Sequence, residues 1–355
     1  MRVVQILCAA GPVDAVTNQA LAYRKLFRSW GWSGDDYAPV TAPGMPGGAI
    51  RPLHQLRPGR ADVVVLHYSG HAPGLEDILA RAPRSLLVSH NITPARYFWS
   101  SDPAEAVRCQ LARGQLARLG GLAGALAAVS DFNAAELREI SGREAAVIPI
   151  LFERRGLPAA PVPQPGVTSA VDAAAPVILF VGRLVPHKRQ DLVIRAFARF
   201  HHTRPGARLT LVGVPLSPGF AAGLQRLADR LAPGAVTFAS TLTASDLWRH
   251  YRAAAAFLCL SEHEGFCIPL LEAFHFRLPV IARRAGAVAE VLGAAGVLLD
   301  ADDGEDVVAE VLRIVVDDGE LRHELADRGE GRLDAYAHER TAARLREALT
   351  ELVAR

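Results

Sequence analysis

The chain has 355 residues, half of them hydrophobic and 21% charged, so it can bury the cores of two domains. Its formal net charge of +2 is too close to neutral to favour nucleic acid as the main partner. The four cysteines show no CxxC or metal-ligand spacing, which favours buried free thiols and a reducing compartment. No apolar run is long enough for a membrane-spanning helix. We therefore expect a cytoplasmic protein with at most peripheral membrane contact.

Short apolar runs alternate along the chain with helical patterns, an order typical of parallel sheets covered by helices. In the first half, strands are predicted over residues 3–8, 63–67, 85–89 and 125–129, and helices over 21–30, 76–81, 104–119 and 134–140. In the second half, strands are predicted over 177–181, 208–212, 236–239, 255–260, 279–282 and 297–299. Helices are predicted there over 191–200, 220–231, 244–251, 269–276, 305–316 and 321–329, with a last one over 339–353. The sequence thus predicts an α/β protein with two similar halves.

A proline-rich segment, residues 153–176, separates the two halves. It carries five prolines and many alanines with little periodicity, which is the composition of an extended linker. We therefore expect an N-terminal Rossmann-like domain over 1–152 and a C-terminal one over 177–335. A terminal helical segment, 336–355, closes the chain.

The most informative segment, residues 261–274, follows a predicted buried strand. Pro269 suits the first turn of a helix, so Glu264 falls in the preceding loop and Glu272 one turn into the helix. The start of a helix favours anions because its first N–H groups lack partners. Carboxylates on both sides of an anion-binding spot suit a ligand with a central phosphate and hydroxyl groups at both ends. A nucleotide-sugar has that shape.

A second loop, residues 182–191, follows the first strand of the second half. Ligands of doubly wound sheets bind beyond the carboxyl ends of the strands, where this loop lies. Gly182 allows a tight turn, while Arg183 supplies a planar fork and Lys188 a compact charge for phosphate oxygens. Two such cations can hold a diphosphate and stabilise the charge that grows as it leaves. Taken alone, the loop is equally consistent with a solvated basic turn.

Together the two segments resemble the retaining GT-B glycosyltransferases of family 4, also called glycosyl transferases group 1. The resemblance extends through the second half, over residues 177–188, 192–197, 211–213, 236–238 and 247–251. It implies a GT-B fold, α/β, with two Rossmann-like domains whose parallel sheets face a central cleft. The first domain would bind the acceptor and the second the nucleotide-sugar donor, with the C-terminal helix packing back on the first.

The resemblance implies an enzyme that moves a sugar, with retention, from a UDP- or GDP-sugar to an acceptor hydroxyl or thiol. The acceptor would be a glycan, a lipid-linked sugar or a small metabolite. Arg183 and Lys188 would grip the diphosphate, Glu272 would accept hydrogen bonds from the ribose, and Glu264 would contact the transferred sugar. Backbone N–H groups near Phe266 would meet the phosphate, and base contacts would come from residues 238–242. The implied donor-binding set is Gly182, Arg183, Lys188, Glu264, Gly265, Phe266, Cys267 and Glu272.

The first half diverges more, but residues 90–94 spell His-Asn-Ile-Thr-Pro after a predicted strand. This motif is similar to that of one subgroup of the same family. By that resemblance His90 would contact the donor sugar and join Arg183, Lys188 and Glu264 as a catalytic residue. A lone histidine at a strand end is otherwise more often structural.

Two further loops of the first half offer acceptor-site candidates. Residues 10–18 lack the glycine pair that many family members carry, which leaves Asp14, Thr17 and Asn18 as candidates. His67 and Tyr68 lie at the end of another predicted strand. They either line an acceptor pocket or are simply polar loop residues.

Some features have simpler explanations. Ser130 or Asp131 is expected to cap a helix. The acidic residues 300–303 contain an Asp-x-Asp spacing, but Gly304 and a helix follow, so we expect a turn, no metal and no cofactor. Alternatives to transfer are a nucleotide-sugar epimerase or phosphorylase of the same fold, or a non-catalytic nucleotide-sugar-binding subunit. The intact set of two cations and two glutamates disfavours the binding subunit.

Overall fold

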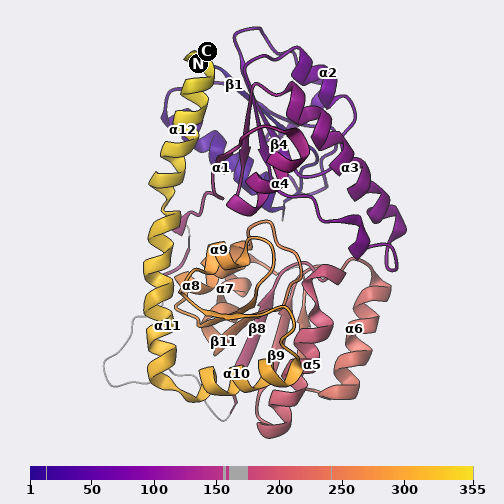
Figure 1. Cartoon of the computed structure of the whole chain (residues 1–355), viewed down its shortest axis with the longest axis vertical. Coiled ribbons are helices and arrows are strands. Elements are labelled where there is room, and N and C mark those ends of the chain that lie inside the picture. Colours follow the sequence, from indigo (N-terminus) through magenta and orange to yellow (C-terminus); the bar gives the residue numbers. More distant parts are fainter. Residues whose placement is uncertain (13, 155–156, 160–174, 241, 355) are drawn as a thin grey trace. The chain divides into compact units, whose positions relative to one another are not determined.

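The computed structural model describes residues 1–12, 14–154, 157–159, 175–240 and 242–354. The chain divides into two compact units, Met1–Phe152 with Tyr336–Arg355, and Glu153–Ala335 (Figure 1). Each unit contains one parallel sheet with helices packed around it. Of the predicted linker, residues 155–156 and 160–174 lie outside the described residues.

The sheet of the first unit has the strand order β3-β2-β1-β4-β5-β6-β7, with parallel pairs throughout. Its strands are β1 (Val3–Leu7), β2 (Asp36–Ala38), β3 (Arg51–Pro52), β4 (Val63–Tyr68), β5 (Ser85–Ser89), β6 (Ala125–Ala128) and β7 (Ala146–Val147). Every residue of β1, β4 and β5 is buried. These strands are mostly apolar because helices cover both faces of a parallel sheet, and their polar members, such as Gln5 and His67, are buried as well.

The α-helices in the described part of the first unit are α1 (Ala15–Ser29), α2 (Leu75–Ala80), α3 (Pro103–Leu122), α4 (Asp131–Ser141) and α12 (His338–Ala354). Short 3-10 turns lie at Leu53–Gln55 and Ala95–Tyr97. Helix α12 buries Leu345, Leu349 and Leu352, whose spacing places them on one face of the helix. Arg344 on the same helix donates a hydrogen bond to the carbonyl of Val147 at the end of β7. The last helix is therefore part of the first unit.

The sheet of the second unit has the order β10-β9-β8-β11-β12-β13, again with parallel pairs. Its strands are β8 (Val177–Val181), β9 (Arg208–Val212), β10 (Val236–Ala239), β11 (Ala256–Cys259), β12 (Val280–Arg283) and β13 (Val297–Leu299). Its helices are α5 (Gln190–Thr203), α6 (Pro218–Leu231), α7 (Ala244–Ala253), α8 (Ile268–His275), α9 (Val288–Leu292), α10 (Glu305–Asp317) and α11 (Gly319–Arg332). Phe197, Leu211, Leu258 and Leu312 are fully buried members of the core between sheet and helices.

The strand order fixes which loops meet. From β8 the chain proceeds outward through β9 and β10, and then returns to the other side of β8 with β11. The loops after β8 and β11 therefore lie side by side at the point where the direction reverses. Open α/β sheets bind their ligands at such a point. In the first unit the same reversal lies between β1 and β4.

The predicted α/β class with parallel sheets is confirmed, and five strands have the predicted bounds to the residue: β5, β8, β9, β10 and β13. The prediction missed β2, β3, β7 and α9, which are five residues or shorter. Helix α1 begins at Ala15 and not at residue 21, because Asp14 caps it by accepting a hydrogen bond from the Thr17 amide at 2.7 Å. Thr17 and Asn18, which we had placed in a loop, thus belong to the helix. No helix in the described part of the chain is long and apolar enough to cross a membrane.

Candidate functional site

An ion pair joins the loops that follow β8 and β11. Lys188 Nζ donates a hydrogen bond to Oε1 of Glu264 at 2.7 Å, and the Ser261 hydroxyl donates to the same oxygen at 2.7 Å. The side chains of Lys188 and Glu264 are only 17% and 8% exposed. An ammonium carries three N–H donors and a carboxylate two oxygens. Among the described residues, Lys188 thus keeps donors and Glu264 keeps Oε2 for a ligand.

Both partners of this pair stay ionised. Burial alone would raise the pKa of Glu264, but the charge of Lys188 and the two hydrogen bonds hold that pKa below its ordinary value. Burial alone would lower the pKa of Lys188, but the attraction of Glu264 holds it above its ordinary value. A buried positive charge next to a buried negative one is therefore maintained through the neutral pH range.

Glycines allow the backbone to close around the pair. The side chain of Lys188 packs across Gly182, where an added Cβ would lie 3.4 Å from Lys188 Cδ. A Cβ on Gly213, at the end of β9, would lie 1.9 Å from the Gly182 carbonyl oxygen. A Cβ on Gly286, whose φ is +53°, would lie 2.2 Å from the Glu264 carbonyl oxygen. That oxygen also accepts a hydrogen bond from the Ala287 amide at 2.9 Å, so the backbone of Glu264 is held from the β12 loop.

Helix α8 begins at Ile268, one residue before the predicted start. Pro269 lies in its first turn, and Glu272 lies one turn inside. Cys267 precedes the helix with a φ of +74°, a conformation uncommon for residues other than glycine. The first N–H groups of a helix have no partner within it, so this end attracts an anion. Gly265 and Phe266 lead into this turn from Glu264.

Glu272 has a partner that the sequence reasoning missed. The Tyr251 hydroxyl donates to Oε2 of Glu272 at 2.6 Å. The Tyr251 ring is stacked on Phe257 and on Phe276, with centroids 6.2 and 5.5 Å away. Burial raises the pKa of Glu272, and the hydrogen bond from Tyr251 only partly opposes that rise. Tyr251 lies on α7, 21 residues before Glu272, and carried no signal beyond its place at the end of a predicted helix.

Arg183 is the exposed cation of the β8 loop. Its carbonyl accepts a hydrogen bond from the Gln190 side chain at 3.0 Å, which fixes the backbone. Its guanidinium forms no ion pair with any residue that the structure describes. Arg189, by contrast, is engaged by Glu262 and Asp191. Of these two arginines, Arg183 is therefore the one available to an anion.

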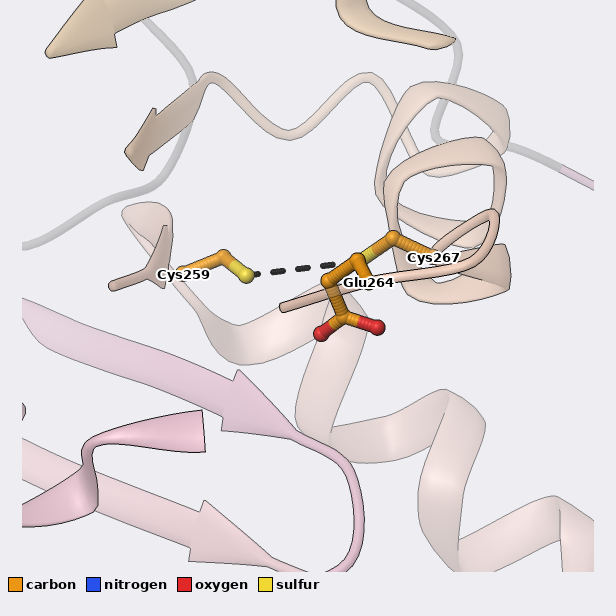
Figure 2. A group of neighbouring side chains, drawn as sticks. All are labelled: Cys259, Glu264 and Cys267. Carbon is orange, nitrogen blue, oxygen red and sulfur yellow. Dashed lines mark hydrogen bonds between the residues drawn. The ribbon is translucent and has the colours of Figure 1, made fainter. Parts of the chain in front are cut away.

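Cys259, Glu264 and Cys267 form a buried group of three possible metal ligands, with their ligand atoms within 4.8 Å of one another (Figure 2). The two Sγ atoms are 4.0 Å apart and share a hydrogen bond. This bond and burial raise the pKa of Cys267, which favours the neutral thiol. A metal ion would have to remove that proton and bind beside the ammonium of Lys188, whose positive charge repels it. The group therefore fits a metal poorly, and its cysteines are buried and unoxidised, as predicted.

A cavity of about 230 Å³ opens beside this site, at the carboxyl ends of β8, β9 and β10. Leu184, Gly213, Phe238, Ala239 and Ser240 are among its lining residues. Part of the segment 238–242, which we predicted to contact a base, therefore lines a cavity. Residue 241 lies outside the described residues.

In the first unit, His90 follows β5, and its amide donates to the Tyr68 carbonyl at 2.9 Å. The acceptor-pocket prediction for His67 and Tyr68 is wrong, because both side chains are fully buried in the central strand β4. The Tyr68 hydroxyl donates to the carbonyl of Ala112 at 2.8 Å, and both ring nitrogens of His67 have partners. The strand pattern did not reveal this, since a polar side chain at the end of a central strand can point either way.

Asp14 and Thr17 build the start of α1. Thr17 is fully buried, and its hydroxyl donates to Asp14 Oδ2 at 2.7 Å and accepts from the Gly11 amide at 3.1 Å. Asn18 is exposed on the same helix. The burial of Thr17 removes it from the acceptor candidates, whereas Asp14 and Asn18 stay exposed.

The two predicted turn and cap features have the expected structure. Ser130 caps α4 by accepting a hydrogen bond from the Asn133 amide at 3.2 Å. Asp303 accepts a hydrogen bond from the Asp300 amide at 2.8 Å, which closes the acidic turn before α10. Neither feature belongs to the site.

Residues 168–332 match the family model described as glycosyl transferases group 1. Two similar proteins are D-inositol 3-phosphate glycosyltransferases. The one from Acidothermus cellulolyticus is 36% identical over 42% of this chain and 35% of its own length. The one from Geodermatophilus obscurus is 32% identical over 50% of this chain and 40% of its own length. The chain thus spans well under half the length of these relatives.

Solved structures resemble the whole chain. Alr3699/HepE of Anabaena, in complex with UDP and glucose, has a TM-score of 0.74 at 18% identity, covering 98% of this chain and 99% of its own. Sucrose-phosphate synthase of Thermosynechococcus elongatus has a TM-score of 0.74 at 18% identity, covering all of both chains. WaaG, a glycosyltransferase of lipopolysaccharide biosynthesis, has a TM-score of 0.66 at 17% identity, covering 96% of this chain and 98% of its own. The fold is therefore the GT-B fold, and the match to the glycosyl transferases group 1 model falls within the second unit.

Proposed function

We propose that the protein is a glycosyltransferase that moves a sugar from a nucleoside-diphosphate sugar to an acceptor hydroxyl. The observation that carries the proposal is the buried Lys188–Glu264 pair at the strand-order reversal of the second unit. The start of α8 and the unpaired Arg183 lie in the same two loops. Cations and helix N–H groups suit a diphosphate, and a carboxylate oxygen suits sugar hydroxyls.

The chemistry that this arrangement favours is departure of the diphosphate. Negative charge grows on the leaving phosphate as the bond to the sugar breaks, and fixed positive groups lower the barrier to that step. Lys188 is fixed by Glu264 and retains N–H donors, while Arg183 adds a second charge. We propose substitution on one face with retention through an oxocarbenium-like state, without a metal ion. The departing phosphate oxygen would then help to take the acceptor proton.

Other positions acquire roles within the same proposal. Glu272 accepts hydrogen bonds from the ribose through Oε1, because Tyr251 occupies Oε2. The nucleobase enters the cavity bordered by Phe238. His90 contacts the transferred sugar, a role that its resemblance to the His-Asn-Ile-Thr-Pro motif suggests. Asp14 and Asn18 remain the candidates for acceptor contact.

The test is acceptor-dependent release of nucleoside diphosphate. UDP-glucose and GDP-sugars are supplied with an acceptor panel that includes D-inositol 3-phosphate, the compound named for the relatives. Release of UDP or GDP only with an acceptor, together with a glycosylated product, is the expected result. The product's anomeric signals by NMR show retention, and activity that survives EDTA supports the metal-independent step. Activity that is lost when EDTA is added and returns when Mg²⁺ is added would overturn the proposal of a metal-independent step.

The same experiment separates the alternatives. Conversion of the donor without any acceptor indicates an epimerase. Cleavage of a glycoside that requires inorganic phosphate indicates a phosphorylase. Tight binding of a donor that is never consumed indicates a binding subunit.

A further inference from the structure

A buried chain of hydrogen bonds in the first unit leads from His90 to the interior of the sheet. His90 Nε2 lies 3.0 Å from His67 Nδ1, and His67 Nε2 lies 2.8 Å from Gln5 Oε1. Gln5 Nε2 donates to Asp36 Oδ1 and to the Ala20 carbonyl, both at 2.8 Å. Gln5 and His67 are fully buried, and Asp36 is almost so. Because these side chains are buried, each contact must have a matching donor and acceptor.

The direction of the chain is fixed at its inner end. A carboxylate oxygen and a backbone carbonyl can only accept, so the amide nitrogen of Gln5 must face Asp36 and Ala20. Its carbonyl oxygen, Oε1, therefore faces His67 and can also only accept. It follows that His67 Nε2 carries a proton and donates it to Gln5.

His67 is neutral, because its burial and the neighbouring Arg24 hold its pKa well below the ordinary value. Asp36 is paired with Arg24 at 2.6 Å, so its negative charge is neutralised and does not favour a second proton on His67. A neutral His67 protonated at Nε2 has only a lone pair at Nδ1. His90 must then donate from Nε2, and its own Nδ1 carries a lone pair. That Nδ1 atom is buried and has no hydrogen-bond partner among the described residues.

We propose that Gln5 and His67 are positioning residues that hold His90 in one form, a neutral imidazole protonated at Nε2 with the Nδ1 lone pair unused. In this form His90 accepts a hydrogen bond from a hydroxyl and does not donate one from Nδ1. Burial lowers the pKa of His90 to about 3, in keeping with a ring that stays neutral. The identity of the ligand rests on the proposed function, under which the hydroxyl belongs to the transferred sugar. A donor that lacks this hydroxyl would leave a buried acceptor unpaired and would be rejected.

The form of His90 can be measured without any donor or acceptor. Two-bond ¹H–¹⁵N correlation spectra of the full-length, histidine-labelled protein distinguish protonated from unprotonated ring nitrogens. The chain has 12 histidines, and His90→Gln identifies the His90 signals by their loss. We expect a protonated Nε2, an unprotonated Nδ1 and no titration across the neutral range. A His90 protonated at Nδ1, or an imidazolium, would overturn the proposal while leaving the transferase assignment untouched.

Variants of Gln5 test the positioning role. Gln5→Glu loses the two hydrogen bonds donated to Asp36 and Ala20, and the carboxylate beside His67 raises the pKa of His67, so His67 gains a second proton and donates to His90. The protonated nitrogen of His90 then changes from Nε2 to Nδ1, and turnover falls roughly tenfold, the value of one hydrogen bond. Gln5→Leu removes the acceptor and gives a mixture of both forms. Gln19→Leu is the matched control, since Gln19 is buried in the same unit but bonds the Leu151 amide.

An unchanged His90 spectrum in both Gln5 variants would show that the chain does not determine the form of His90. If these variants do not fold, the wild-type spectrum still decides the state of His90.

Discussion

Lys188 and Glu264 are 76 residues apart in the chain, yet they form a 2.7 Å ion pair that is almost closed to solvent. The contact exists because β8 and β11 are neighbours in the sheet although two strands separate them in sequence. Neither residue is free to change alone. If either residue is replaced by a neutral one, the charge of the other is left buried without a partner. Variants of the site must therefore be interpreted with both residues in mind.

Lys188→Met is expected to slow turnover by the equivalent of about 3–4 kcal/mol, because the growing phosphate charge loses a fixed cation. It also leaves Glu264 buried without its partner, which costs about 3–5 kcal/mol of stability. The double variant Lys188→Met with Glu264→Gln removes the unpaired charge and should recover much of the stability but not the turnover. Thermal unfolding and kcat measured on both variants separate the two effects. Turnover that returns with stability would reject the catalytic role of Lys188.

Glu272→Gln is expected to stabilise the protein while weakening nucleotide binding. Burial raises the folded-state pKa of Glu272 above the ordinary 4.5, so the folded wild type loses stability as pH rises through that value. The glutamine keeps an acceptor for Tyr251 without a charge, so the variant is more stable than the wild type at neutral pH, and this gain vanishes well below pH 4.5.

Denaturant unfolding at several pH values and calorimetry with UDP measure both consequences of Glu272→Gln. A variant that is less stable at neutral pH, or one that binds UDP like the wild type, would contradict the assignment.

Arg183→Ala is expected to leave stability unchanged, since the side chain is exposed and has no ion pair in the described part of the chain. Affinity for a nucleoside diphosphate should fall about tenfold or more, the value of a hydrogen bond to a charged group. The difference from wild type should shrink as salt is added, because screening weakens an exposed cation. Arg199→Ala, on α5 with a side chain 60% exposed, is the control and should bind normally. Equal losses in both variants would indicate only a general charge effect.

Gly286→Ala is expected to disturb the site through the backbone of Glu264. The added Cβ would lie 2.2 Å from the Glu264 carbonyl oxygen, and the φ of +53° is unfavourable for alanine. The loop that carries Glu264 must shift, so stability and turnover both decrease. Gly223→Ala in α6 is the matched control, because nothing lies within 4 Å of its new Cβ. That variant should be as stable as wild type or gain up to about 1 kcal/mol. A Gly286→Ala protein with wild-type stability to unfolding and wild-type activity would show that the loop accommodates the added Cβ without loss of stability or turnover.

Much of this protein could be read from local patterns. A continuous apolar run such as residues 177–181 predicted a buried parallel strand, since a strand covered on both faces needs no polar positions. Pro269 fixed the start of α8, and with it the loop position of Glu264 and the helical position of Glu272. Edge strands of two or three residues, such as β3 and β7, carry too few residues for any period and were missed.

The amino-acid sequence by itself determined the α/β class, the strand and helix order, and which charged residues end up at the ends of strands. Only the tertiary structure decided that Lys188 pairs with Glu264, that Tyr251 reaches Glu272, and that His67 is buried behind His90. The physical reason is that these contacts depend on which strands are neighbours in the sheet. Burial, and therefore the charge and proton state of each group, is a property of long-range packing that no local pattern records.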